Sequence, residues 1–132
     1  MDTEPRHLRI LVVEDEPLIR WSIAETLAHG GHTVIEAGNA STAVRAMKAA
    51  TDTIDVVLLD YRLPDSNDLG LLADIRRMIP RSAVVMMTAY GAPETTREAL
   101  DLGAYRVLDK PFDMDRLESL VREADNARPR LH

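Results

Sequence analysis

The stretch VVLLDYRLPDSNDLGLL, residues 56–72, joins an apolar run, an aspartate, a polar turn and the start of a second apolar pattern. The unbroken apolar run before Asp60 is typical of a strand that is covered on both faces. After the turn, apolar residues recur at the spacing of one helix face until Pro80 ends the pattern. These residues are Leu69, Leu72, Ile75 and Ile79. The stretch therefore predicts a buried β-strand followed by an α-helix.

The same alternation of strand and helix patterns continues in both directions from this stretch. The predicted strands are residues 8–13, 33–36, 54–59, 83–87 and 105–108. The predicted helices begin at Pro17, near Ala40, around Leu69, near Pro93 and near Asp113. Five strand–helix units in succession predict an α/β fold. Its parallel strands would be joined by right-handed crossovers, with helices on both faces of the sheet.

The length and composition fit one domain of ordinary size. The chain has 132 residues, of which 45% are hydrophobic and 29% are charged, as expected for one core with a solvated surface. We assign residues 1–7 to an N-terminal extension and residues 8–124 to the domain. Residues 125–132 are polar and contain a proline, so they are predicted to be a tail or the start of a linker.

Composition excludes several classes of protein. The chain has no cysteine, so disulfides and cysteine–metal sites are excluded and a reducing cytoplasm is compatible. The apolar runs are too short to span a membrane, and residues 1–7 lack the apolar region of a secretory signal. The net charge of −6 repels the phosphate backbone, which argues against direct binding of nucleic acid.

Polar residues follow four of the five predicted strands at the point where each strand ends. They are Glu14, Asp15 and Glu16 after the first strand, Asp60 after the third, Thr88 after the fourth and Lys110 after the fifth. In open α/β sheets, ligands bind beyond the carboxyl ends of the strands. We therefore expect these side chains to gather at one edge of the sheet.

This set of side chains predicts a phosphate and metal site. Crowded carboxylates repel one another and need a cation, and oxygen ligands without histidine or cysteine select a hard ion such as Mg²⁺. Glu14 and Asp15 would hold the metal, and Asp60, in the middle of the edge, would be the nucleophile that forms an acyl phosphate. Lys110 would neutralise one phosphoryl oxygen, and Thr88 would donate a hydrogen bond to another.

Four segments together resemble the receiver domains of bacterial two-component response regulators. They are ILVVEDEPLIR (10–20), VVLLDYRLPDSNDLGLL (56–72), VVMMTAYG (84–91) and GAYRVLDKPFD (103–113). The resemblance covers roughly residues 8–124, and the combination is far more specific than any single segment. It implies a flavodoxin-like (βα)5 fold of three layers, with a parallel five-stranded sheet of order 2-1-3-4-5.

The resemblance also implies how the site is used. A sensor histidine kinase or a phosphotransfer protein would pass a phosphoryl group to Asp60 in the presence of Mg²⁺. The metal would be held by Asp15, by Asp60 and by the backbone carbonyl of Arg62, whereas Glu14 would act mainly through a metal-bound water. A cis peptide bond is implied between Lys110 and the proline that follows it.

The expected output is a change of the surface formed by the fourth helix, the fifth strand and the fifth helix. That surface would bind a second copy of the chain or another partner. VVMMTAYG and LDKPFD most resemble receivers of transcription activators that carry an ATPase module, which implies control of transcription in the cytoplasm. Such a domain catalyses only its own phosphorylation and dephosphorylation.

Two positions depart from the family pattern. The family usually has an aromatic residue three positions before the lysine, where this chain has Val107. Tyr105 is expected on the same face as Val107 because strand residues alternate. The family often has glycine eight residues after the phosphoacceptor, where this chain has Asp68. Asp65 is a second extra acid in the same loop, and the two acids are expected to change kinase docking or metal affinity.

Two other functions remain open. A phosphatase that works through an aspartyl phosphate would use the same acids, but it needs an acid for the leaving group and a cap, for which the chain has no long insertion. A pseudo-receiver, which binds partners without being phosphorylated, is kept open by Val107. Acetyl phosphate with Mg²⁺ separates the three: a switch gains one phosphoryl group, a phosphatase turns over and a pseudo-receiver does not react.

Overall fold

Five strands and five α-helices alternate along the described part of the chain. The computed structural model describes residues 6–66, 69–89 and 91–128. The elements are β1 (Arg9–Val13), α1 (Pro17–His29), β2 (Thr33–Ala37), α2 (Ala40–Ala49), β3 (Val56–Asp60), α3 (Gly70–Met78), β4 (Ala83–Thr88), α4 (Pro93–Asp101), β5 (Arg106–Asp109), the 3₁₀ turn η1 (Met114–Arg116) and α5 (Leu117–Ala127). The predicted succession of strands and helices is therefore confirmed.

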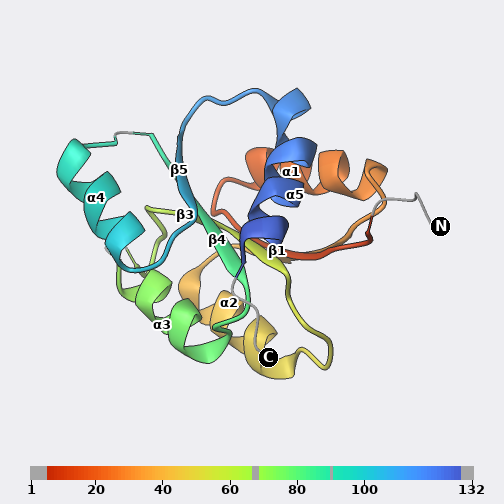
Figure 1. Ribbon diagram of the computed structural model, residues 1–132, viewed down its shortest axis with the longest axis horizontal. Helices are drawn as coiled ribbons and strands as arrows, with labels where there is room; N and C mark the ends of the chain where they lie inside the picture. Colours follow the sequence, from red (N-terminus) through yellow and green to blue (C-terminus); the bar gives the residue numbers. More distant parts are fainter. Residues whose placement is uncertain (1–5, 67–68, 90, 129–132) are drawn as a thin grey trace.

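All strands of the sheet are parallel, and their order is β2-β1-β3-β4-β5. The helices α1 and α5 cover one face, and α2, α3 and α4 cover the other (Figure 1). This arrangement confirms the predicted flavodoxin-like three-layer fold of order 2-1-3-4-5. It leaves β3 in the centre of the sheet, between β1 and β4.

The alternation of side chains along each strand divides the core into two halves. In β1, Leu11 and Val13 pack with α2 and α3, whereas Ile10 and Val12 pack with α1 and α5. All four side chains are fully buried, as are most residues of β3 and β4. Continuous apolar runs are the pattern of strands covered on both faces, which is why these runs predicted the sheet.

The prediction that Tyr105 lies on the same face as Val107 is wrong. Val107 packs against the half of the core formed by α2, α3 and α4, but Tyr105 packs against the half that contains α1 and α5. The strand β5 begins only at Arg106, so the alternation that holds within a strand does not extend back to Tyr105. The Arg106 guanidinium lies 5.3 Å from the centre of the Tyr105 ring.

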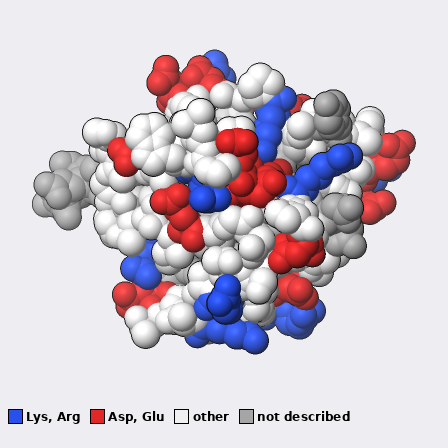
Figure 2. All heavy atoms as spheres, turned by 180° about the vertical axis from the view of Figure 1, so that it is seen from behind, with Lys and Arg blue, Asp and Glu red and all other residues white. Residues whose placement is uncertain are grey.

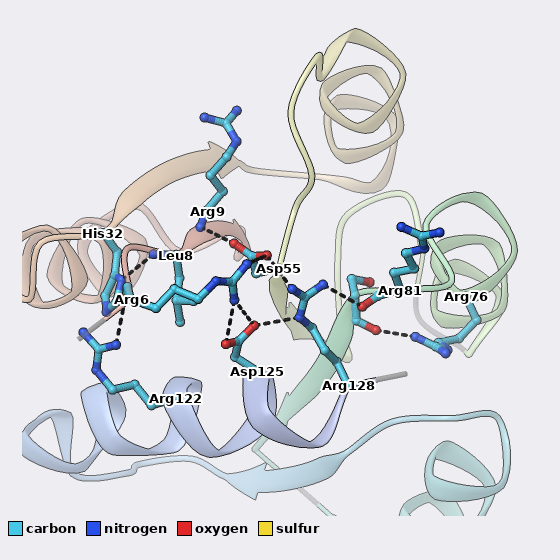
Figure 3. A network of polar contacts seen from close by, with 11 residues as sticks. Arg6, Leu8, Arg9, His32, Asp55, Arg76, Arg81, Arg122, Asp125 and Arg128 are labelled. Atoms are coloured by element: carbon cyan, nitrogen blue, oxygen red, sulfur yellow. Dashed lines mark hydrogen bonds and ion pairs between the residues drawn. The ribbon is translucent and has the colours of Figure 1, made fainter. Parts of the chain in front are cut away.

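The two ends of the described chain meet at the amino edge of the sheet (Figure 3). Asp125 accepts from Arg6 at 2.6 Å and from Arg128 at 2.7 Å. The neighbouring Asp55 pairs with the same two arginines, at 2.9 Å and 3.3 Å. Both carboxylates are at least 90% buried. The predicted tail thus begins inside α5, which continues to Ala127, and Arg6 of the predicted N-terminal extension contacts the domain.

We expect Asp125→Ala to lower the free energy of unfolding by about 2–3 kcal/mol. Removing one partner of a buried ion pair typically costs about 3–5 kcal/mol, and the half-exposed Arg6 can recover part of this by hydration. Urea unfolding at constant m-value measures the change. The matched control is Asp74→Ala, which removes an exposed pair with Arg77 and should cost less than about 1 kcal/mol. Equal losses in both variants would contradict a structural role for the network.

Candidate phosphoacceptor and metal site

The central strand presents Asp60 at the carboxyl edge of the sheet. Asp60 is the last residue of β3 and Thr88 is the last residue of β4, while Glu14 directly follows β1. All three are buried, with exposed fractions of 0% for Glu14 and 6% for the other two. The backbone N–H of Lys110 donates to the Thr88 carbonyl at 2.8 Å, which brings the end of β5 to the same edge. The structure therefore gathers the predicted side chains as the strand order requires.

Three carboxylates form a candidate metal site. Oxygen atoms of Glu14, Asp15 and Asp60 lie within 4.8 Å of one another, and Asp15 is exposed. Hard oxygen donors with access from solvent fit Mg²⁺, which keeps several waters and takes few protein ligands. Arg62 lies two residues after Asp60, and its backbone N–H donates to Asp60 Oδ1 at 3.4 Å. The donor set of this edge is thus compatible with the predicted ion.

Lys110 neutralises part of this negative charge. Its Nζ lies 2.5 Å from Glu14 Oε1 and 3.3 Å from Asp60 Oδ2. The Lys110 side chain is 17% exposed, so these interactions are only weakly screened by solvent. The peptide bond between Lys110 and Pro111 is cis, as predicted.

The acids at this edge differ in pKa. Burial, together with the neighbouring Glu14, raises the pKa of Asp60 to about 7 against the opposing effect of Lys110. Burial also acts to raise the pKa of Glu14, but hydrogen bonds from Lys110 and from the Glu16 backbone outweigh it and hold that pKa below its ordinary value. Glu14 is therefore the ionised partner of Lys110, and Asp60 is the acid that titrates near neutral pH.

Arg20 of α1 supports the acids, although no pattern in the sequence singles this residue out. Its Nη1 donates to the backbone carbonyl of Glu14 at 2.8 Å, and its Nε pairs with Glu36 of β2 at 3.3 Å. An arginine in the first turns of a helix is common on a solvated surface. Only the folded arrangement shows that it ties the loop after β1 to β2.

Val107 of β5 pairs with Met86 of β4 and lines a pocket with Thr88, near the carboxyl edge of the sheet. Val107 and Thr88 line a small pocket of about 10 Å³, together with Tyr61, Leu69, Met86, Thr95 and Ala99. A void of that size is about the minimum for one water molecule, so it has no room for an aromatic ring. The position where the family usually has an aromatic residue is thus filled by a small aliphatic side chain packed into the core.

The extra acids of the loop after β3 do not both lie at the metal site. The Asp65 carboxylate accepts from the backbone N–H groups of Ala40 and Ser41 at the start of α2, at 2.8 Å and 3.0 Å. Asp68 lies outside the described residues. Asp65 therefore acts on helix α2 rather than as a further ligand at the edge.

Acidic and basic side chains are interspersed on the face shown in Figure 2, with a group of acidic side chains near its centre. Among the described residues, this face has no continuous basic stripe of the kind that binds nucleic acid. In the described part of the chain, no helix combines the length and the apolar character needed to cross a membrane.

Comparison with known proteins places this arrangement in one family. The model of the response regulator receiver domain matches residues 10–122. The regulatory protein AtoC of Escherichia coli is 38% identical over 116 residues, which are 88% of this chain and 25% of AtoC. TcrA, a transcriptional regulatory protein of Mycobacterium tuberculosis, is 38% identical over 92% of this chain and 49% of its own length. The chain spans between a quarter and a half of these curated relatives.

Solved structures agree with the fold. A receiver domain protein described as CheY-like, from Methanospirillum hungatei, has a TM-score of 0.84 at 26% identity, covering 92% of this chain and 95% of that one. NtrX from Brucella abortus, solved in complex with ADP, has a TM-score of 0.81 at 35% identity. That match covers 92% of this chain and 26% of NtrX.

We expect Asp60→Asn to stabilise the metal-free protein at pH 8. The pKa of Asp60 is raised from 3.8 to about 7 in the folded state, so the native protein binds this proton more tightly than the unfolded chain. The stabilisation that it contributes is complete below about pH 4 and is lost as the pH rises through 7. The variant, which carries no titrating group there, should melt a few degrees higher than the wild type at pH 8, and the difference should shrink toward pH 5.

Thermal unfolding in the presence of a chelator, at intervals between pH 5 and pH 8, measures this difference. The exposed Asp74→Asn variant is the control and should follow the wild type. A constant offset between Asp60→Asn and wild type across that range would contradict the raised pKa.

Proposed function

This chain belongs to the family of response-regulator receiver domains, and from that premise we propose that it is a phosphoacceptor switch whose acceptor is Asp60. The observation that carries the proposal is the position of Asp60 at the end of the central strand, 3.3 Å from Lys110 and within 4.8 Å of two further carboxylates. The phosphoryl donor would be a sensor histidine kinase or a phosphotransfer protein of a two-component system.

In the proposed reaction an Asp60 carboxylate oxygen attacks the phosphorus of a phosphohistidine. The bond from phosphorus to the donor nitrogen breaks, the electron pair stays on that nitrogen, and Asp60 becomes an acyl phosphate. A bound Mg²⁺ would offset the charge of the crowded acids and of the phosphoryl oxygens. Asp15, Asp60 and the Arg62 carbonyl would hold the ion, and Glu14 would act through a water bound to it.

Lys110 and Thr88 would receive the phosphoryl oxygens. The Lys110 ammonium already lies between Glu14 and Asp60, so it can follow the charge from the carboxylate to the phosphoryl group. The Thr88 hydroxyl can donate to a second oxygen because β4 ends beside β3. Both residues border α4 and β5, so their movement would change the surface of α4, β5 and α5.

The state of Glu14 favours a switch over a phosphatase that uses the same acids. Such a phosphatase needs a protonated acid to release its leaving group. Glu14 pairs with Lys110 at 2.5 Å and its pKa is held below the ordinary value, so it is ionised at neutral pH and cannot serve as that acid. The domain would then catalyse only its own phosphorylation and dephosphorylation.

The output that we propose is control of transcription in the cytoplasm. The relatives NtrC of Escherichia coli and of Azospirillum brasilense are described as DNA-binding transcriptional regulators, and each is 36% identical to this chain. This chain covers 24% of each of them, so the DNA-binding activity need not lie in the domain itself. A second copy of the chain, paired through α4, β5 and α5, is the partner we propose for the phosphorylated form.

We expect acetyl phosphate with Mg²⁺ to add one phosphoryl group to the wild-type protein and none to Asp60→Asn. Intact-protein mass spectrometry measures the gain, and a chelator should abolish it in the wild type. Asp74→Asn, on the exposed surface of α3, is the matched control and should be labelled normally. Labelling of Asp60→Asn at the wild-type level would show that the acceptor is another residue, and turnover without a stable adduct would favour the phosphatase.

Beryllofluoride, which mimics the bound phosphoryl group, should change amide exchange mainly between Thr88 and Arg116. The ligand would contact Thr88 and Lys110. The pocket beside Val107 is too small for an aromatic ring, so no ring rotation there can accompany binding. We therefore expect the largest change in α4 and in the loop before it. The ligand can shift the conformations only by binding one of them better. Changes confined to α1 and α2 would contradict this output surface.

A further inference from the structure

The loop after the phosphoacceptor is anchored to helix α2 by one side chain. Both carboxylate oxygens of Asp65 accept backbone N–H groups, Oδ1 from Ala40 at 2.8 Å and Oδ2 from Ser41 at 3.0 Å. The contact joins residues 24 and 25 positions apart in the sequence. Asp65 thus connects the loop between β3 and α3 with the start of α2.

Helix α2 does not depend on Asp65 alone for its N-terminal cap. Asn39 occupies the N-cap position, and its side chain accepts from the Thr42 backbone N–H at 2.8 Å. This local bond already supplies the usual stabilisation of a helix start. The additional bonds from Asp65 therefore constrain the loop as well as the helix.

Backbone hydrogen bonds and a buried side chain hold residues 61–66, which lie between Asp60 and this contact. Leu63 and Ser66 form an antiparallel bridge, in which the Leu63 N–H donates to the Ser66 carbonyl at 2.8 Å. Asp65 therefore lies in a tight turn. Leu63 is 6% exposed and packs in the core, and the Tyr61 N–H donates to the Met87 carbonyl at 2.8 Å. Arg62 lies between these fixed points.

We propose that Asp65 is a positioning residue of the metal site, which holds the backbone at Arg62 in place through its attachment to α2. The inference rests on the proposed function, in which the Arg62 carbonyl is a ligand of Mg²⁺. Asp65 itself would not be a ligand of the ion. It restrains the motion of the loop that carries the ligand, so the loop is already ordered before the ion binds and no ordering cost is added to binding.

The hydrogen bonds from Ala40 and Ser41 also hold the pKa of the Asp65 carboxyl below its ordinary value. The carboxylate is therefore ionised at neutral pH, with a negative charge at the positive end of the α2 dipole. An asparagine at this position could accept through one oxygen only and would lose the charge.

Two matched variants separate positioning of the site from capping of α2. Asp65→Ala removes the bonds from the loop, and Asn39→Ala removes the local bond to Thr42. Isothermal calorimetry measures Mg²⁺ affinity in each protein, and acetyl phosphate labelling over a range of Mg²⁺ concentrations gives the half-maximal concentration and the maximal rate. Amide exchange of residues 61–66 in the metal-free protein reports loop motion.

We expect Asp65→Ala to weaken Mg²⁺ binding about 10-fold, which is the lower end of the effect typical of residues that orient metal ligands. The maximal labelling rate should stay within about two-fold of the wild-type rate. Residues 61–66 should exchange faster. Asn39→Ala should leave the affinity and that exchange unchanged, and Asp65→Asn should lie between Asp65→Ala and wild type.

Equal losses of Mg²⁺ affinity in Asp65→Ala and Asn39→Ala would overturn the proposal, because they would show an effect of helix stability alone. Wild-type affinity in Asp65→Ala would overturn it as well, and so would a wild-type protein that binds no Mg²⁺. A wild-type protein that binds Mg²⁺ with the expected pattern but accepts no phosphoryl group would instead contradict only the proposed function.

Discussion

The pairing of Lys110 with Glu14 and Asp60 is the interaction on which the carboxyl edge of the sheet depends. Two buried carboxylates next to each other would repel, and the ammonium group 2.5 Å from one and 3.3 Å from the other makes their burial tolerable. The sheet order makes this possible because it sets β3 between β1 and β4. The balance is incomplete, since Asp15 adds a third carboxylate within 4.8 Å of the other two. A divalent cation would remove that deficit, so the proposed affinity for metal and the raised pKa of Asp60 have one electrostatic cause.

The fold and the gathering of the site residues could be predicted because both follow from short-range patterns. Continuous apolar runs require two covered faces, and residues that end parallel strands must meet at one edge. What could not be predicted depends on where a strand begins or on which distant group a side chain meets. Tyr105 fell on the unexpected face because β5 starts one residue later than its apolar pattern suggests. Asp65 was recognised as an extra acid, but its bonds to α2 bridge residues far apart in the sequence.

The site illustrates how stability and chemistry are divided between the two halves of the core. The half formed with α2, α3 and α4 contains Val107 and the small cavity next to Thr88, and the loop that carries Asp65 rests on the same side. The half formed with α1 and α5 holds many large, fully buried side chains and ends in the ion pairs of Asp125. Movement driven from the carboxyl edge would therefore meet less resistance on the side of α4 than on the side of α1.

Arg6 and Arg128 both form ion pairs with Asp55, and this determines where further domains could be attached. Both guanidinium groups contact Asp55 at the amino edge of the sheet, and the acids of the site lie at the carboxyl edge, on the opposite side of the molecule. Domains fused before Arg6 or after Arg128 would be attached at the edge opposite the place where the proposed phosphoryl donor would approach. The same geometry suits the described part of the chain to circular permutation, because a short peptide could join Arg6 to Arg128 without crossing the site.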